Sequence, residues 1–210
     1  MDAIELLTTT KAVRRRIDFD RPVPYETLEA CVEIAVKAPL GGEAWQPHFL
    51  IVDDRAKVEQ IGTIYNAVNQ PYIDDIEKKA LANAAPSEHD RIRRTHDGFR
   101  WHGDQMSRMP ALVIVGVMGR YENDAQIMQA SAYGSILPAA WSFMLAGRTM
   151  GLGATWTTLH LANADAVAEI LSLPSDFTQA VMLAVGYYEG DSFKPATRQP
   201  VSTYTHHNGW

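Results

Sequence analysis

Hydrophobic residues recur at helical spacing in several segments, each bounded by residues that start or stop a helix. Between residues 24 and 38, Leu28, Cys31, Val32 and Ala35 share one face, and a proline suits the first helical position. The same pattern predicts four other helices: a short one capped by Asp2, one that Asp53 or Asp54 caps, a long one from about Ala125 to Met150 that Pro138 should kink or break, and Ala164–Leu171 with Asn163 as its cap.

Short apolar runs rich in β-branched residues separate these helices and predict strands. The clearest run, Ala111–Val117, lies between Pro110 and Gly119. Helices come first, strands and helices then alternate, and an extended tail ends the chain, which indicates an α+β or α/β protein. The other predicted strands are Phe49–Val52, Ala154–Leu159 and Ala180–Tyr188.

Two segments lack a packing pattern of their own. Residues 70–109 are polar with scattered aromatic residues, including Trp101. They predict helical pieces outside the core, either a lid or a solvated helical hairpin with Trp101 packed beneath it. Residues 190–210 contain two prolines and little helical pattern. No repeat or linker interrupts the chain, so we expect a single domain over residues 1–210.

Composition and charge narrow the class of protein. The chain has 210 residues, of which 46% are apolar and 21% charged, and its net charge is −6. This composition excludes a disordered chain, and the net charge argues against nucleic acid as a partner. The longest apolar stretch, Pro110 to Gly119, is half of the roughly 20 residues that a membrane helix needs. A lone cysteine, Cys31, and no secretory signal predict a cytoplasmic protein.

Two short motifs are candidates for ligand binding. Arg14-Arg15-Arg16 places three cations together in an acidic chain, which fits either an anion site or a solvated basic turn. The loop Ala38–Glu43 contains Gly41 and Gly42, which permit close approach of a flat ligand or simply form a turn.

Other candidates are less specific. Thr155–Thr158 reads as a polar strand, and Arg198 lies between two prolines in the tail. The seven histidines show no metal-binding spacing, so we expect no metal site. No Gly-x-Ser-x-Gly motif is present, which leaves no sign of a serine hydrolase.

Taken in order, these features resemble the nitroreductase family of FMN-dependent oxidoreductases. The resemblance rests on Val13–Pro24, on the loop Ala38–Glu43, on Leu137–Trp141 with Gly151-Leu152-Gly153 and Thr157–His160, and on Arg198-Gln199-Pro200. Thr8-Thr9-Thr10, Trp156–His160 and Asn208-Gly209-Trp210 look like an actinobacterial, mycobacterial-type branch.

The resemblance implies an α+β sandwich in which helices flank a mostly antiparallel sheet. It also implies a homodimer that exchanges residues 190–210 as a wrapping tail, with FMN at the interface. Residues 70–109 would cover the flavin, and Trp101 would contact the substrate.

Carried over by position, the resemblance assigns cofactor-binding roles to three motifs. Arg14, Arg15, Arg16 and Arg198 would meet the FMN phosphate. Pro39, Leu40, Gly41, Gly42 and Glu43 would follow the ribityl chain and the ring, and Trp156, Thr157 and Thr158 would edge the ring. Asp18, Glu43 and Trp45 depart from the family pattern.

The implied activity is hydride transfer from NADH or NADPH to FMN and then to a nitroaromatic, quinone or other conjugated acceptor, by a ping-pong mechanism. Because the flavin supplies the chemistry, no acid–base residue is expected. The alternatives are a specialised flavin dehydrogenase or reductase of a biosynthetic pathway, and a flavin-binding protein without turnover.

Overall fold

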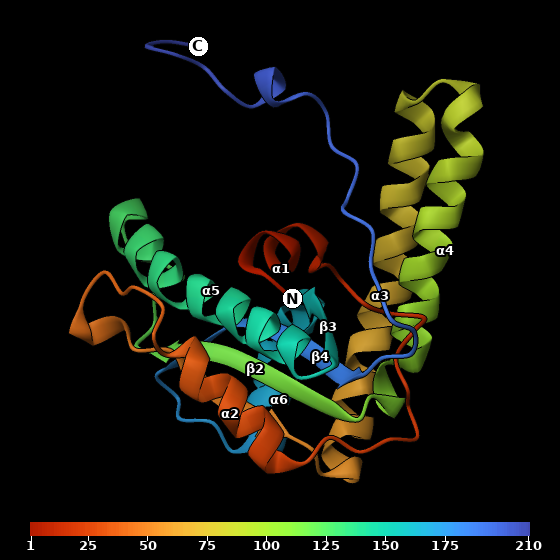
Figure 1. Ribbon diagram of the computed structural model, residues 1–210. Helices are drawn as coiled ribbons and strands as arrows, with labels where there is room; N and C mark the ends of the chain where they lie inside the picture. Colours follow the sequence, from red (N-terminus) through yellow and green to blue (C-terminus); the bar gives the residue numbers. More distant parts are fainter.

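A four-stranded antiparallel sheet forms the centre of the protein, and helices cover both of its faces (Figure 1). The computed structural model describes all 210 residues. The strands lie in the order β1-β2-β4-β3, and every neighbouring pair is antiparallel. Their bounds are β1 His48–Val52, β2 Ala111–Met118, β3 Leu152–Thr157 and β4 Phe177–Tyr187.

Both faces of the sheet are buried, which explains why the central strands are continuously apolar rather than alternating. In β2, Val113 and Val115 pack with Phe143 on one face. Leu112 and Ile114 pack with Ile61 on the other face. Alternate side chains of a strand point to opposite faces, so one strand contributes to two hydrophobic clusters.

Each face has its own helices. The first face carries α2 (Tyr25–Ala35) and α5 (Gln126–Thr149), and α1 (Ala3–Thr9) contacts α5. The second face carries α3 (Arg55–Asn83) and α6 (Ala164–Leu171), and α4 (His89–Gln105) packs against α3. These elements confirm the α+β class expected from the sequence.

Two helices run through an internal proline. We expected Pro138 to kink or break α5. A break is wrong, because α5 continues through Pro138 to Thr149. Proline removes one backbone hydrogen bond, but Ala139, Ala140 and Phe143 are buried beside it and their packing holds the helix. Likewise α3 passes through Pro71 to Asn83.

The helix caps agree with the sequence in two of three places. Asp2 accepts a hydrogen bond from the Glu5 backbone N at 2.8 Å. Asp54, rather than Asp53, accepts one from the Lys57 backbone N at 3.0 Å. At Asn163 only the position is right: this residue is the N-cap of α6, but its side chain makes no capping hydrogen bond.

Residues 70–109 contain the second half of α3 and all of α4, and these two helices form a hairpin. Figure 1 shows α3 and α4 side by side and extending past the sheet. Arg100 on α4 pairs with Asp74 and Glu77 on α3, which joins the two helices.

No helix in the protein has the length and apolar character needed to cross a membrane. Residues 190–210 run away from the body as a largely exposed tail (Figure 1).

Candidate functional site

A cavity of about 260 Å³ lies between strand β3, helices α3 and α4, and the segment that carries Arg14. Aromatic and aliphatic side chains supply most of its walls, and no carboxylate lines it. The lining residues are Arg14, Tyr65, Asn69, Tyr72, Ile73, Ile76, Phe99, His102, Thr155, Trp156, Thr157 and Leu159.

Arg14 is positioned because residues next to it are bound to the edge of β3. The Val13 backbone N donates to the Ala154 carbonyl at 3.0 Å, and the Thr155 hydroxyl donates to the Val13 carbonyl at 2.7 Å. Gly153 permits this contact, since a Cβ there would meet the Val13 Cβ at 2.8 Å. The arginine therefore shares a cavity with Trp156 and Thr157.

The cavity is cationic and contains unpartnered polar atoms. The Arg14 Nε is buried without a hydrogen-bond partner, and burial lowers the pKa of its guanidinium. The guanidinium is half-buried, lies 4.9 Å from the Phe99 ring centroid and has no ion pair, so it is free to pair with an anion.

His102 lies in the same cavity and is uncharged at neutral pH. The residue is 3% exposed, and neither ring nitrogen has a partner. Burial, with a smaller effect from the Arg14 charge, lowers the His102 pKa to about 4. Nearby, the hydroxyls of Tyr65 and Thr157 lie 3.0 Å apart in a hydrogen bond. The site thus offers neutral hydrogen-bonding groups around one cation.

The three adjacent arginines separate in the structure. Arg15 places its guanidinium carbon 5.3 Å from the Trp101 ring centroid. Arg16 donates to the carbonyls of Glu189 and Ser192 at 2.5 and 2.8 Å. Of the triplet, only Arg14 lines the cavity.

The glycine loop and Arg198 lie elsewhere in the chain. The Gly41 backbone N donates to the Ser135 hydroxyl on α5 at 2.9 Å. None of Pro39, Leu40, Gly41, Gly42 and Glu43 lines the Arg14 cavity. Arg198 is exposed, and its one side-chain hydrogen bond is to the neighbouring Thr197 carbonyl. Thr158 directly follows β3 and is exposed.

Trp101 packs outside the cavity. Its ring meets the Phe19 ring edge-on at 6.0 Å between centroids, and it is absent from the cavity lining. The adjacent residue, His102, lies on the side of α4 that faces the cavity. In the single chain, the Trp101 ring therefore packs against Phe19 and does not line the cavity.

Sequence reasoning missed Tyr65, Asn69, Phe99 and His102 as site residues. A signal was present for one of them, because Asn69 interrupts the apolar series Ile61, Tyr65 and Ile73, spaced four residues apart on α3. Asn69 is 1% exposed and donates to the Phe99 carbonyl at 3.2 Å. A buried amide in an apolar stripe marks a polar site rather than core.

Comparisons with known proteins agree with this architecture. The family model described as the nitroreductase family matches residues 13–187. A search of curated proteins found no match.

Three solved structures illustrate the similarity of the fold. Oxidized iodotyrosine deiodinase bound to FMN and 3-iodo-L-tyrosine has a TM-score of 0.71, 23% identity and coverage of 99% of both chains. A BluB-like flavoprotein from Clostridium difficile 630 has a TM-score of 0.69 and 20% identity, again with 99% of both chains covered. The NfrA1 nitroreductase from B. subtilis has a TM-score of 0.70 and 18% identity, covering 99% of this chain and 74% of that one.

Proposed function

This chain belongs to the nitroreductase family, and from that premise we propose that it is an FMN-dependent oxidoreductase. In this proposal it takes hydride from NADH or NADPH and reduces nitroaromatic, quinone or other conjugated acceptors in a ping-pong cycle. The observation that carries the proposal is the cavity lined by Arg14, whose Nε has no hydrogen-bond partner, with no carboxylate in the lining.

The residues of the cavity fit a flavin nucleotide. The Arg14 guanidinium, which has no ion pair, suits the phosphate, while Tyr72 and Trp156 offer apolar surface to a planar ring. Asn69 and Thr157 supply hydrogen-bonding groups for its polar edge. The chemistry that bound FMN supplies is the acceptance and release of hydride, so the chain has to position the flavin and its partners.

One chain supplies only part of such a site. The cavity of about 260 Å³ is below the roughly 300–1,000 Å³ typical of ligand sites. Several residues that the family resemblance assigns to FMN lie outside this cavity: the loop Pro39–Glu43, Thr158, Arg15, Arg16 and Arg198. We propose that they bind FMN in a homodimer, where a second chain brings the missing groups to the cavity.

Exposed apolar side chains support a dimer. Ile4 and Leu7 on α1 are 71% and 53% exposed, and Ile127 on α5 is 73% exposed. Such surface is covered in many proteins by a second subunit. Residues 190–210 would wrap this partner, and the hairpin of residues 70–109, with Trp101, would close over the flavin. We also propose that residues 1–210 form a single domain, that the protein works in the cytoplasm, and that it belongs to the actinobacterial branch of the family.

The loop supports a specialised reductase as the second candidate. Gly41 and Gly42 lie against the Trp45 ring, with ring atoms 3.4–3.6 Å from the position that a Cβ would take at either glycine. Glu43 follows them and is exposed. A carboxylate accepts hydrogen bonds but donates none, so Glu43 favours an acceptor substrate with N–H or O–H groups.

The test uses the purified full-length protein. We expect a yellow protein with a flavin absorption spectrum, bleached by NADH or NADPH without oxygen and recoloured by the acceptor. A panel of nitroaromatics, quinones and acceptors rich in N–H groups then separates the two candidates. A protein that neither holds nor takes up FMN overturns both, and one that holds FMN but is not reduced is a binding protein without turnover.

Arg14→Ala is expected to weaken FMN binding by about 1.5–3 kcal/mol, the contribution of a hydrogen bond to a charged group. Arg21→Ala is the matched control, because Arg21 is exposed and lies over the Tyr187 ring, outside the cavity. Fluorescence titration of the apoprotein with FMN measures both affinities. Equal affinities for wild type and Arg14→Ala would exclude Arg14 as a phosphate ligand.

Deleting residues 195–210 is expected to cost both the dimer and the flavin. The deletion removes Arg198 and the exposed Tyr204 and Trp210, while the sheet and helices α1–α6 stay intact because none includes these residues. Sizing chromatography with absorbance at the flavin band reports both properties. A truncated protein that stays dimeric and yellow contradicts the wrapping tail.

A further inference from the structure

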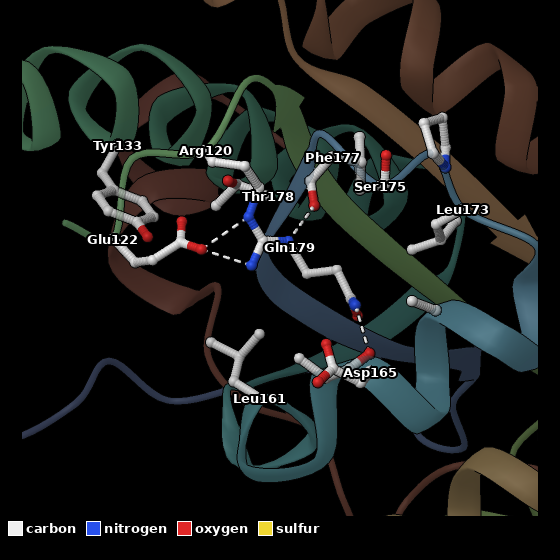
Figure 2. A pocket seen from close by; sticks show the side chains of 13 residues that line it. Arg120, Glu122, Tyr133, Leu161, Asp165, Leu173, Ser175, Phe177, Thr178 and Gln179 are labelled. Atoms are coloured by element: carbon white, nitrogen blue, oxygen red, sulfur yellow. Dashed lines mark hydrogen bonds and ion pairs between the residues drawn. The ribbon is translucent and has the colours of Figure 1, made fainter. Parts of the chain in front are cut away.

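A second and larger cavity, of about 510 Å³, lies near the start of β4 and shares no lining residue with the Arg14 cavity. The turn Leu159–Asn163 separates them, since Leu159 lines the first and Leu161 the second. Its volume is in the range of small-molecule sites. Figure 2 shows Arg120 and Glu122 on one side of this cavity and, on another, the hydrogen bond from Gln179 to the Ala164 carbonyl, next to Asp165.

The only cation of the lining is already neutralised. The Arg120 Nε and Nη2 lie 2.7 and 2.5 Å from one Glu122 oxygen, and Nη1 donates to the Phe177 carbonyl at 3.4 Å. An anion entering the cavity would therefore find no free arginine and would meet the Asp165 carboxylate instead.

The free groups are hydrogen-bond acceptors. Asp165 lines the cavity and is exposed, with no ion pair or hydrogen bond to its carboxylate. Gln179 is 8% exposed; its Nε2 is fixed by a 2.8 Å bond to the Ala164 carbonyl, and its Oε1 has no partner. A buried amide oxygen left unpaired is costly, so this wall favours a ligand that donates hydrogen bonds.

The surrounding charge has the same sign. The segments 119–125 and 174–179 carry Glu122, Asp124 and Asp176 against Arg120 alone, which makes this end of the sheet attractive to cations.

A bare metal ion does not fit, because the structure holds no cluster of three or more candidate ligands and hard cations need several oxygens. The remaining wall is apolar, formed by Leu161, Ala168, Leu173 and Pro174.

We propose that this cavity binds a small organic ammonium ion, a protonated amine whose body is about the size of a phenyl ring. The ammonium group pairs with Asp165 and donates toward Gln179, and the carbon body packs on the apolar wall. The site is separate from the proposed flavin site, so its failure would leave the flavin proposal untouched.

The experiment titrates the flavin-loaded full-length protein with 2-phenylethylamine at pH 7 by calorimetry. We expect saturable binding, and binding of the neutral 2-phenylethanol weaker by about tenfold or more, because a charge-assisted hydrogen bond is lost. Equal binding of the alcohol, or tighter binding of 3-phenylpropionate, overturns the proposal, as does the absence of amine binding.

Two variants locate the site. Asp165→Asn is expected to weaken amine binding by about tenfold, while Glu169→Gln, one turn further along the same helix and absent from the cavity lining, leaves it unchanged. Ala168→Leu fills the apolar wall and is expected to abolish binding without loss of the helix. Amine binding that survives both Asp165→Asn and Ala168→Leu places the ligand elsewhere and refutes the assignment.

Discussion

Lowering the pH from 7 to 4 is expected to destabilise the folded protein by several kcal/mol, because two buried histidines stay uncharged in the fold. His102 and His160 are 3% and 0% exposed, and no ring nitrogen of either has a hydrogen-bond partner. Burial lowers the pKa of each to about 4 from an ordinary value of 6.5. Their neutral forms are therefore the folded forms.

The sign follows from which state takes up protons. In the unfolded chain both histidines bind a proton near pH 6.5, whereas in the fold they resist it until about pH 4. Their contribution to stability is full above pH 6.5 and falls as the pH drops from 6.5 to 4. Each group accounts for roughly 3 kcal/mol over this window.

Urea unfolding at pH 7, 6, 5 and 4.5 measures this loss of stability. Carboxylates also respond to acid, so the informative quantity is the difference between wild type and His160→Leu, whose free energy of unfolding should fall less steeply with pH. His207→Asn is the matched control, since His207 is exposed in the tail. Parallel curves for wild type and His160→Leu would show that His160 does not titrate as argued.

Gly62→Ala is expected to destabilise the protein by about 3 kcal/mol or more, although alanine is the better helix former. Gly62 lies on α3 where the helix meets the turn Met106–Arg108. A Cβ at this position would lie 2.3 Å from the Ser107 backbone N and 2.4 Å from its Cα. Because these atoms are backbone, the two segments have to move apart.

The displacement should also reach the flavin site. Tyr65 and Asn69 follow Gly62 on α3 and line the Arg14 cavity, so FMN affinity is expected to fall together with stability. Gly98→Ala on α4 is the control: no atom lies within 4 Å of its added Cβ, and it should stabilise the protein by up to about 1 kcal/mol. Thermal melts and FMN titration of both variants test this pair, and a Gly62→Ala protein as stable as wild type would contradict the close contact.

Much of the fold was predictable because hydrophobic periodicity reports burial locally. The strand predicted over Ala111–Val117 became β2, Ala111–Met118, and the helix predicted over Ala164–Leu171 has those same bounds in α6. Proline misled the prediction at Pro138, since a local rule cannot weigh the lost hydrogen bond against packing contributed by distant residues.

The sequence by itself determined the main helices and strands, left the class as α+β or α/β, and supplied the order of motifs that resembles the family and implies α+β. Only the tertiary structure decided that Arg14 enters a cavity with Thr157 and His102 while Arg16 turns to the tail. The reason is physical. Residues 11–16 belong to no helix or strand, so no period sets their orientation, and hydrogen bonds from Val13 to β3 and from Arg16 to residues 189–192 set it instead.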